Sequence, residues 1–494
     1  MAQLTISRDG KSSVFTFSGE MPLRDALEQS GFALAHPCGG RGTCGKCAVT
    51  LSGAVSAPNA AEQRAGVRLS CQAVLLGDAQ VILPDSSDLE QIETAGAACI
   101  EASAPMEGRF GAAVDIGTTT LALKLCELST GRILSEAGMR NPQASVAADV
   151  MGRIQHALEG GLARLQSQVL TAIQSLLSAA CRDAQLDESL VDVLVLTGNT
   201  TMLYLLTGRS PESLAHAPFQ ADTLFGAETT LLGRRAYLPH CMNAFVGADI
   251  TCAVLSSGMC EQSDVALLCD VGTNGEIALW KDGVLYVTST AAGPAFEGAG
   301  ISCGCGSVRG AVDKAWIERG AVRVHTIGDA PAVGVCGSGL IDLIAAFLQT
   351  GDIDETGAIE EDALSVTDGV ALSAKDVRCV QLAKAAIAAG IETLLETAGV
   401  DVQDVRRFYI AGGFGSHLNI DSAVRIGLIP AALASRVQVI GNAALSGALQ
   451  MLLNRQSLSR AQEIAQRASH LNLGGNPSFN EHYIDQMFFP EEEE

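Results

Sequence analysis

The feature that most constrains the fold of this chain is an internal duplication. An apolar stretch that runs into Asp-x-Gly-Thr occurs twice, as AVDIGTTTLAL from Ala113 and as LCDVGTNGEIAL from Leu268, and each copy continues to a hairpin turn. Two further pairs follow in the same order, LTGNTTM with IAGGFGS and FVGADITCAVL with VIGNAALSGAL. Matched pairs in one order predict a tandem duplication of one α/β unit over about residues 109–455.

The repeated turns carry the residue types that bind phosphate. A tight turn after a buried strand exposes backbone N–H groups, and glycine lets a phosphate approach closely. Threonine hydroxyls add donors, and an aspartate at each strand end can hold Mg²⁺ through water or orient an attacking water. We therefore expect a nucleotide site with the catalytic residues Asp115 and Asp270 and the binding residues Gly117, Thr118, Thr119, Gly272, Thr273, Asn274, Gly412 and Gly413.

This arrangement resembles the ASKHA superfamily of acetate and sugar kinases, Hsp70 and actin. In that superfamily the two Asp-x-Gly-Thr loops are the phosphate motifs, and the later Gly-Gly turn is the adenosine motif. The resemblance implies a duplicated actin-like, RNase H-like ATPase fold that takes ATP and Mg²⁺, with subdomains over residues 109–265 and 266–479. The alternative is a degenerate scaffold that binds no nucleotide.

A glycine-rich run of cysteines near the N-terminus, CGGRGTCGKC, predicts a redox centre. Its C-x5-C-x2-C spacing and one distant cysteine supply the four thiolates that a [2Fe–2S] cluster needs: Cys38, Cys44, Cys47 and Cys71. The intervening glycines let the backbone wrap around the cluster. Zinc sites prefer paired C-x2-C hooks, and only one such pair is present here. Zinc and inert cysteines therefore remain as the less favoured alternatives.

The segments around these cysteines predict two strands joined at Asp9–Gly10, a short helix ending at Gly31, and further strands in CAVTLSG and RLSCQAVLL. This order resembles plant- or adrenodoxin-type ferredoxins, which implies a β-grasp fold over residues 1–86. The small and acidic residues 87–108 predict a linker. Residues 480–494 predict an acidic, solvated tail.

Charge and composition exclude several classes of partner. The net charge of −23 argues against nucleic acid and against anionic membrane surfaces. No apolar run reaches the ~18–20 residues of a membrane span, and the N-terminus lacks the apolar core of a signal peptide. Fifteen cysteines without an export signal indicate ligands or buried thiols in a reducing compartment. We expect a soluble, cytoplasmic protein.

A ferredoxin joined to an ATPase unit suggests electron transfer coupled to nucleotide turnover. A plant-type cluster lies near about −400 mV, and moving one electron uphill by a further ~100–200 mV costs about 2–5 kcal/mol. The domain order and the motifs CGGRGTCGKC, AAGPAFEGAGISCG, VCGSGLIDL and IAGGFGSHLN resemble the reductive activators of corrinoid proteins. The resemblance implies transfer of one electron to a Co(II) corrinoid, which restores Co(I) for methyl transfer. Its partners would be a corrinoid protein of a methyltransferase system and a low-potential electron donor.

Departures from that family leave some points open. The stretch between residues 87 and 113 is too short for the extra middle domain through which some larger relatives dimerise, so the oligomeric state is not predicted. We expect a single cluster, because no cysteine follows Cys379. Cys303, Cys305 and Cys336 lack a fourth ligand, and we expect them in a turn that lines the cleft. GPAFEG, which contains Glu297, is expected to border the nucleotide or corrinoid face.

Two other functions compete with this interpretation. Activators of radical dehydratases also join ASKHA and iron–sulfur chemistry, but they hold one cluster between two subunits and lack a ferredoxin domain. An electron-transfer adaptor with a non-hydrolysing ASKHA domain is the third possibility. Stimulation of ATPase activity by a Co(II) corrinoid protein would separate the first interpretation from the adaptor.

Overall fold

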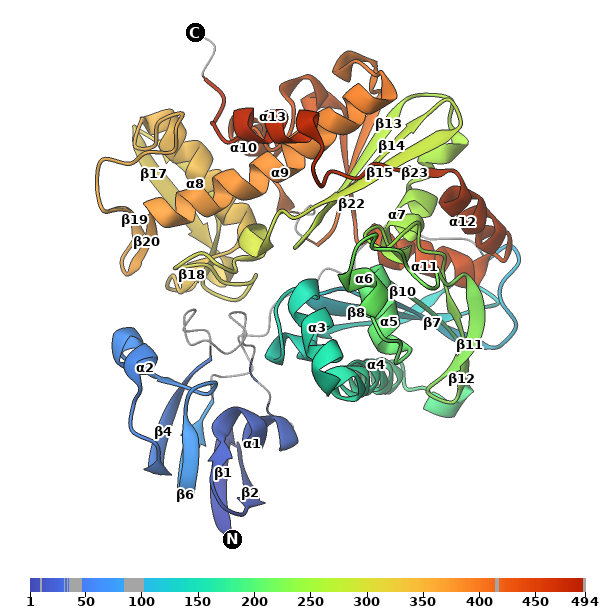
Figure 1. The fold of residues 1–494 in the computed structure, drawn as a ribbon. Coiled ribbons are helices and arrows are strands. Elements are labelled where there is room, and N and C mark those ends of the chain that lie inside the picture. The colour runs from blue at the N-terminus through green and yellow to red at the C-terminus, as the bar shows by residue number, and fades with distance from the viewer. Residues whose placement is uncertain are drawn as a thin grey trace.

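The computed structural model describes residues 1–8, 11–30, 32, 34, 47–83, 102–413 and 417–491. Within them the chain forms a small N-terminal domain and two larger α/β halves with a pocket between them (Figure 1). The N-terminus lies at the outer end of the small domain, and the helix α13 (Pro477–Asp485) lies in the second half, at the opposite end of the molecule. Among the described residues, helices with the length and apolar surface that a bilayer span needs are absent.

The N-terminal domain is a mixed sheet packed against one helix. Its described strands lie in the order β2-β1-β6-β4-β5, with β3 paired to β6. The turn predicted at Asp9–Gly10 lies outside the described residues, but Arg8 pairs with Lys11 as that hairpin requires. The elements are β1 (Ala2–Arg8), β2 (Lys11–Phe17), β3 (Met21–Pro22), α1 (Leu23–Gln29), β4 (Ala48–Val55), α2 (Ala60–Ala65), β5 (Arg68–Leu69) and β6 (Val74–Ile82).

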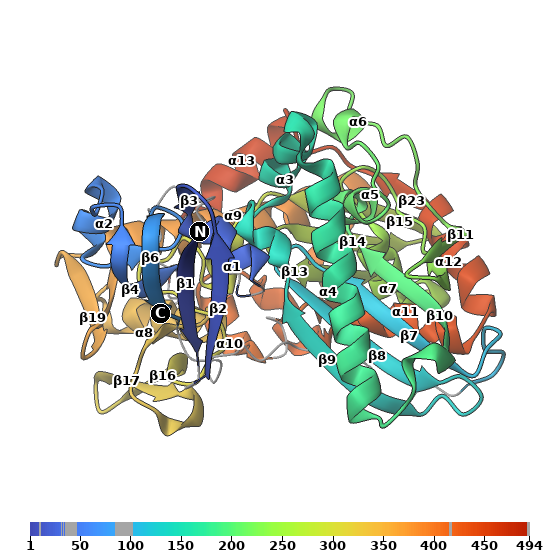
Figure 2. The same cartoon turned by 90° about the horizontal axis from the view of Figure 1, so that it is seen from below.

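This domain has a hydrophobic core of its own. Leu23, Ala26 and Leu27 of α1 pack against the apolar faces of β1 and β6, and every member of this core lies within residues 2–83. The domain therefore buries its apolar surface without help from the rest of the chain. Seen from below, it covers one side of the molecule beside α4 (Figure 2).

The first large half is a six-stranded sheet in the order β11-β12-β10-β7-β8-β9. β7 runs parallel to β10 and antiparallel to β8. The elements are β7 (Phe110–Ile116), β8 (Thr120–Glu127), β9 (Ile133–Arg140), α3 (Val150–His156), α4 (Leu162–Asp183), β10 (Val191–Gly198), α5 (Thr200–Leu206), α6 (Glu212–Ala215), β11 (Ala227–Leu231), β12 (Arg234–Leu238) and α7 (Ala248–Ser257). The long helix α4 covers one face, because Leu165, Val169 and Ile173 recur on the side that packs onto the sheet.

The second large half repeats this topology, which confirms the predicted duplication. Its sheet runs β22-β21-β13-β14-β15-β23, and β13 is again parallel to β21 and antiparallel to β14. The elements are β13 (Ala266–Val271), β14 (Gly275–Lys281), β15 (Val284–Thr290), α9 (Ala374–Ala398), β21 (Arg407–Ala411), α10 (Ile420–Arg425), β22 (Val437–Gly441), α11 (Ala443–Leu453), α12 (Gln456–Gln466), β23 (Ala468–His470) and α13 (Pro477–Asp485).

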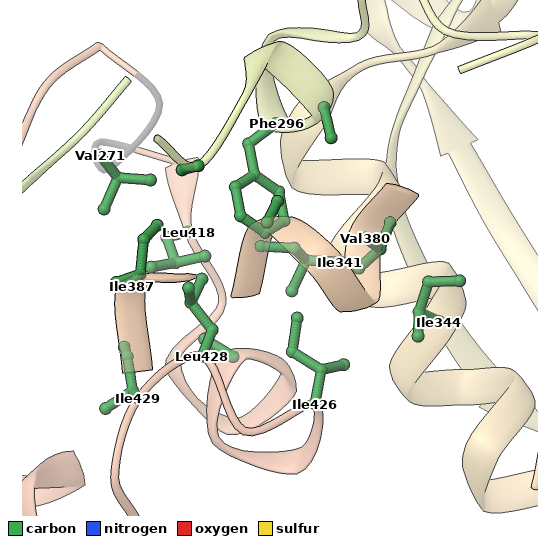
Figure 3. Packing of buried hydrophobic residues seen from close by; sticks show 14 of the residues in the cluster. Val271, Phe296, Ile341, Ile344, Val380, Ile387, Leu418, Ile426, Leu428 and Ile429 are labelled. Carbon is green, nitrogen blue, oxygen red and sulfur yellow. The ribbon is translucent and has the colours of Figure 1, made fainter. Parts of the chain in front are cut away.

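An insertion between β15 and α9 distinguishes the second half. It holds a three-stranded sheet in the order β17-β16-β18, the helix α8 and the pair β19-β20. Their bounds are β16 (Ala311–Glu318), β17 (Ala321–Thr326), β18 (Gly334–Val335), α8 (Gly337–Thr350), β19 (Ala363–Thr367) and β20 (Val370–Ser373). Phe296, Ile341 and Val380 pack into one cluster there, which joins α8 to α9 (Figure 3).

The two halves share part of their core. α7 of the first half packs against α11 of the second, and α11 also contacts β7 and β10. One hydrophobic cluster accordingly combines Val193 and Val195 with Leu445, Leu449 and other residues of both halves. Neither half is a closed unit, because each depends on a helix that the other supplies.

One predicted boundary is wrong. The solvated tail was expected from residue 480, but α13 continues through Asp485 and Phe489 is only 2% exposed. The buried Lys384 of α9 donates to the backbone carbonyl of Phe488, which holds this segment against the helix. The expectation rested on the acidic residues of this segment and gave too little weight to its two adjacent phenylalanines. Burial of Phe489 stabilises the segment against the rest of the protein.

Candidate functional site

The main pocket lies between the two large halves, where the turns after β7 and β13 face each other. All ten residues predicted for the nucleotide site line it: Asp115, Gly117, Thr118, Thr119, Asp270, Gly272, Thr273, Asn274, Gly412 and Gly413. They come from four segments distant in the sequence. The duplicated topology brings the segments together at the same edge of the two sheets.

Five carboxyl groups line this pocket: Asp115, Asp249, Asp270, Glu276 and Glu297. Burial raises the pKa of Asp115 to about 6, and burial together with the charges of Asp115 and Glu297 raises the pKa of Asp270 to about 7. Asp249, which begins α7 with Ala248, has its pKa raised to about 8 by burial and by Asp115 and Asp270. Burial and the neighbouring aspartates also raise the pKa of Glu276. The pocket thus favours protons or a cation.

Polar contacts fix the turn after β7 (residues 117–119), which is the first of the two predicted phosphate-binding turns and is called the first phosphate turn below. Arg153 of α3 is fully buried and donates from Nη2 to the carbonyl of Thr118 at 2.5 Å, and from Nε to Ala147 at 3.0 Å. Asn141 donates to the carbonyl of Gly117 at 2.8 Å. Burial lowers the pKa of Arg153 to about 10, so the guanidinium stays charged at neutral pH. These contacts hold the carbonyl oxygens of Gly117 and Thr118 in place.

The Gly-Gly turn packs directly against an aspartate of the other predicted motif. Gly412 has a φ of +93°, and a Cβ placed on it would lie 2.6 Å from Oδ1 of Asp270. Only glycine allows this approach. The adenosine turn predicted from the sequence therefore abuts the second phosphate strand, as a site that holds both ends of one nucleotide requires.

Several residues of the pocket were not among the predicted site residues. Asn199 donates to Oγ1 of Thr118 at 3.1 Å, and Asn442 donates to Oδ2 of Asp115 at 3.0 Å. Asp249 and Glu276 complete the carboxyl cluster. A signal was available, because the third matched pair of motifs places Asp249 and Asn442 just after equivalent glycines. Among the described residues that line the pocket, lysine and arginine are absent.

The segment GPAFEG was expected to border the nucleotide or corrinoid face, and its Phe296 and Glu297 line this pocket. Of the three cysteines expected in a cleft-lining turn, Cys305 and Cys336 line the pocket, whereas Cys303 is not among its lining residues. Cys305 donates its N–H to Val335 at 2.9 Å, which pairs this turn with β18. In the described part of the chain, no group of three or more histidine, cysteine or acidic side chains has the geometry of a metal site.

The predicted cluster ligands are described in part. Cys38 and Cys44 lie outside the described residues, whereas Cys47 and Cys71 lie with their sulfur atoms 3.3 Å apart. The hydrogen bond between the two thiols, together with burial, raises the pKa of Cys47. Two thiols in contact suit a pair of ligands to one iron, because both can lose their protons to the metal. The described half of the ligand set therefore fits an iron–sulfur cluster.

A buried glutamate supports the cysteine pair. Glu62 is 2% exposed and accepts from the Nε of Arg68 and from the N–H of Leu69, both at 2.9 Å. Hydrogen bonds from Leu69 and Arg68 lower the pKa of Glu62 despite its burial. Because β5 pairs with β4 at Leu69 and Ala48, these bonds fix the strands that end beside Cys47 and Cys71.

Among the described residues, Glu28 links the N-terminal domain to the first large half. Glu28 of α1 accepts from Arg164 and from Gln168, both on α4. Gln168 also contacts the hydroxyl of Ser145 at 3.2 Å. This contact joins the domain that carries the cysteines to the half that carries the first phosphate turn.

Three family models match the chain. They are the 2Fe-2S iron–sulfur cluster binding domain over residues 6–76, the RACo middle region over 110–262, and the C-terminal domain of RACo, the ASKHA domain, over 264–494. The middle domain was expected to be absent or much reduced, and this expectation is wrong, because the model of the RACo middle region matches residues 110–262, the first half of the duplication.

The chain is also similar to individual proteins that act on corrinoid proteins. The corrinoid activation enzyme RamQ of Eubacterium limosum is 34% identical over 419 residues, which cover 77% of this chain and 70% of that protein. The [Co(II) methylated amine-specific corrinoid protein] reductase of Methanosarcina barkeri is 26% identical over 77% of each chain. The solved structure of a reductive activator for corrinoid, iron–sulfur protein covers 99% of this chain and 98% of its own, with a TM-score of 0.72 and 26% identity.

Proposed function

Because the chain belongs to the RACo family of corrinoid-activating proteins, we propose that it uses ATP to reduce a Co(II) corrinoid protein to the Co(I) state. The observation that supports this most directly is the presence, in one chain, of a paired-cysteine domain and a pocket made by two phosphate turns. A kinase of the same architecture needs no thiol pair such as Cys47 and Cys71. An electron carrier alone needs no duplicated phosphate site.

The pocket residues divide between the parts of the nucleotide. The hydroxyls of Thr118, Thr119 and Thr273 and the N–H groups of the glycine turns bind the phosphates. Gly412 and Gly413 admit the adenosine. Asp115 and Asp270 hold Mg²⁺ through water and orient the attacking water. Because the described lining contains several carboxyl groups and neither lysine nor arginine, the nucleotide binds as its magnesium complex.

The N-terminal domain supplies the electron. A [2Fe–2S] cluster held by Cys38, Cys44, Cys47 and Cys71 would store one electron at low potential. The chain's own residues position it: Glu62 and Arg68 brace the strands beside the cysteines, and Glu28 places the domain against α4. Nucleotide turnover between the two halves then drives transfer to the less easily reduced cobalt.

We further propose the cellular setting. The corrinoid protein belongs to a methyltransferase system, in which the cobalt must be Co(I) to accept a methyl group, and a low-potential donor recharges the cluster. Cytoplasmic location suits a chain whose described cysteines form no disulfide bond. The net charge of −23 excludes nucleic acid as the partner.

The test is anaerobic single-turnover reduction. The pre-reduced protein is mixed with a Co(II) corrinoid protein, with and without ATP and Mg²⁺, and the Co(I) absorption band is followed. Co(I) should form only with both. Equal reduction without ATP would show that electron transfer is not coupled to ATP turnover. An intact cluster together with an ATPase activity that does not respond to the corrinoid protein would favour the electron-transfer adaptor. D270N, which keeps the cysteine domain intact, serves as the variant that separates the two activities.

A further inference from the structure

One carboxylate oxygen joins the two phosphate turns. Oε2 of Glu297 accepts from Oγ1 of Thr119 at 2.9 Å and from Oγ1 of Thr273 at 2.7 Å, and the two hydroxyls lie 3.3 Å apart. Thr119 follows β7 and Thr273 follows β13, so each hydroxyl belongs to a different copy of the duplicated turn. Glu297 comes from neither turn. It bridges the two halves at the point where their phosphate-binding hydroxyls converge.

An anion at this position competes with phosphate. A threonine hydroxyl has one proton to donate, so it cannot donate at once to a carboxylate and to a phosphate oxygen. Repulsion between the two anions adds to the competition, because lysine and arginine are absent from the described residues that line the pocket. The nearby guanidinium of Arg153 is committed to the backbone behind the first turn.

Two glycines with positive φ flank the turn that carries Glu297. A single turn of 3-10 helix, Pro294–Glu297, lies between Gly293 with φ +80° and Gly298 with φ +72°. Both glycines adopt a left-handed conformation that other residues rarely take, so each marks a sharp change of chain direction. Phe296 anchors the turn from the other side, where it packs beside Ile341 (Figure 3).

The same segment packs against another wall of the pocket, which Cys305, Gly306 and Gly337 line. A Cβ on Gly298 would lie 2.2 Å from the carbonyl oxygen of Cys305, which shows how closely the two backbones pack. Cys305 pairs with Val335 of β18, and α8 begins two residues later at Gly337. A shift of Glu297 therefore changes the packing of β18 and of the α8 N-terminus. In Figure 1 the N-terminal domain lies beneath this wall.

We infer that Glu297 is a latch that the nucleotide displaces: its carboxylate takes the position of a phosphate oxygen between Thr119 and Thr273, and the phosphates of ATP take both hydroxyls from it. The inference rests on the proposed function, because it takes ATP as the ligand. The released segment 294–298 then repacks against Cys305 and β18. In this way occupation of the phosphate site is transmitted to the side of the pocket that faces the electron-carrying domain.

The latch predicts that removing the carboxylate strengthens nucleotide binding. In E297A and E297Q, the Kd for Mg·ATP measured by calorimetry on the full chain should fall by about tenfold or more, because a competing charge-assisted hydrogen-bonded anion is gone. The matched control is E276Q, which removes a pocket carboxyl that does not bridge the two threonines and should tighten binding much less. Because E297Q keeps the shape of the side chain, it still tests the latch if E297A fails to fold.

The possible results are distinct. Unchanged or weaker ATP binding by both Glu297 variants, with a wild-type chain that binds ATP, overturns the latch and leaves the proposed function standing. Equal tightening in E276Q also overturns it, since general charge would then explain the effect. A wild-type chain that binds no ATP overturns the proposed function and the latch together.

Discussion

Asn442 donates its side-chain amide to Oδ2 of Asp115 at 3.0 Å, across 327 positions of sequence. Asp115 ends the first strand of the first half, whereas Asn442 caps α11 in the second half by accepting from the N–H of Leu445 at 2.8 Å. The bond lowers the pKa of Asp115 against the opposing effect of burial. The side chain of Asn442 thus caps a helix of the second half and favours the ionised form of a site residue in the first half.

We expect N442A to lose both contacts. The cap contributes about 1 kcal/mol, and the bond to a charged acceptor contributes about 1.5–3 kcal/mol. The variant should unfold at lower denaturant, and its Mg·ATP affinity should reach its maximum at a higher pH, because the pKa of Asp115 rises. The control N476A removes only a cap, at the surface helix α13, and should leave the pH profile unchanged. An unshifted profile in N442A would contradict the role assigned to this bond.

Magnesium and nucleotide binding should depend on pH between about 6 and 8. Asp115, Asp270 and Asp249 have pKa values raised to about 6, 7 and 8, so they carry protons at the acidic end of this range. A cation requires the ionised carboxylates, and affinity should rise by up to about tenfold per pH unit for each proton released. Calorimetry in buffers of different ionisation enthalpy would count the protons. Affinity that is flat across this range would refute the expectation.

Stability without ligand should move in the opposite direction. These carboxyl groups have folded-state pKa values above their unfolded values, so they favour the folded chain at low pH and lose that contribution as the pH rises through about 6 to 8. Mg²⁺ should therefore raise the melting temperature more at pH 8.5 than at pH 6. Thermal unfolding with and without Mg²⁺ at the two pH values measures the difference.

Substitution of Cys71 should abolish the cluster without unfolding the ATPase halves. Cys47 and Cys71 are in contact, and C71S leaves one iron short of a thiolate. Anaerobically prepared C71S should lack iron and visible absorbance yet bind Mg·ATP as the wild type does. C379A removes a partly buried thiol of α9 and should keep the cluster. Full iron content in C71S would exclude it as a ligand.

The contact between Glu28 and α4 should fix the position of the electron-carrying domain. E28K replaces an acceptor of two donors with a repelling charge, so the radius of gyration measured by small-angle scattering should increase. The double variant with R164E should recover the compact value, and E20K, at an exposed position of the same domain, should not change it. Exposed ion pairs contribute only about 0.2–1 kcal/mol, and added salt should imitate E28K.

The repeated motifs could be predicted from the sequence. Contacts between segments that are distant in the sequence could not. Asp115 and Asp270 could be identified because each ends an apolar strand in a recognisable turn, and the copies confirm one another. Glu297 could be placed near the site but not on the threonines, since that contact depends on how three distant segments meet. The boundary near residue 480 was wrong because the acidic residues of this segment suggested a solvated tail, and only tertiary packing shows that Phe489 is buried.

The return of α11 to the first half has a consequence for biosynthesis. Strands β7 and β10 lack part of their apolar cover until residues 443–453 have left the ribosome, so the nucleotide pocket cannot mature before nearly all of the polypeptide has been made. The cysteine domain, by contrast, completes its interior within the first 83 residues. Iron can therefore be inserted while translation is still under way, so that the cluster can assemble in a nascent chain well before that chain can bind and hydrolyse ATP.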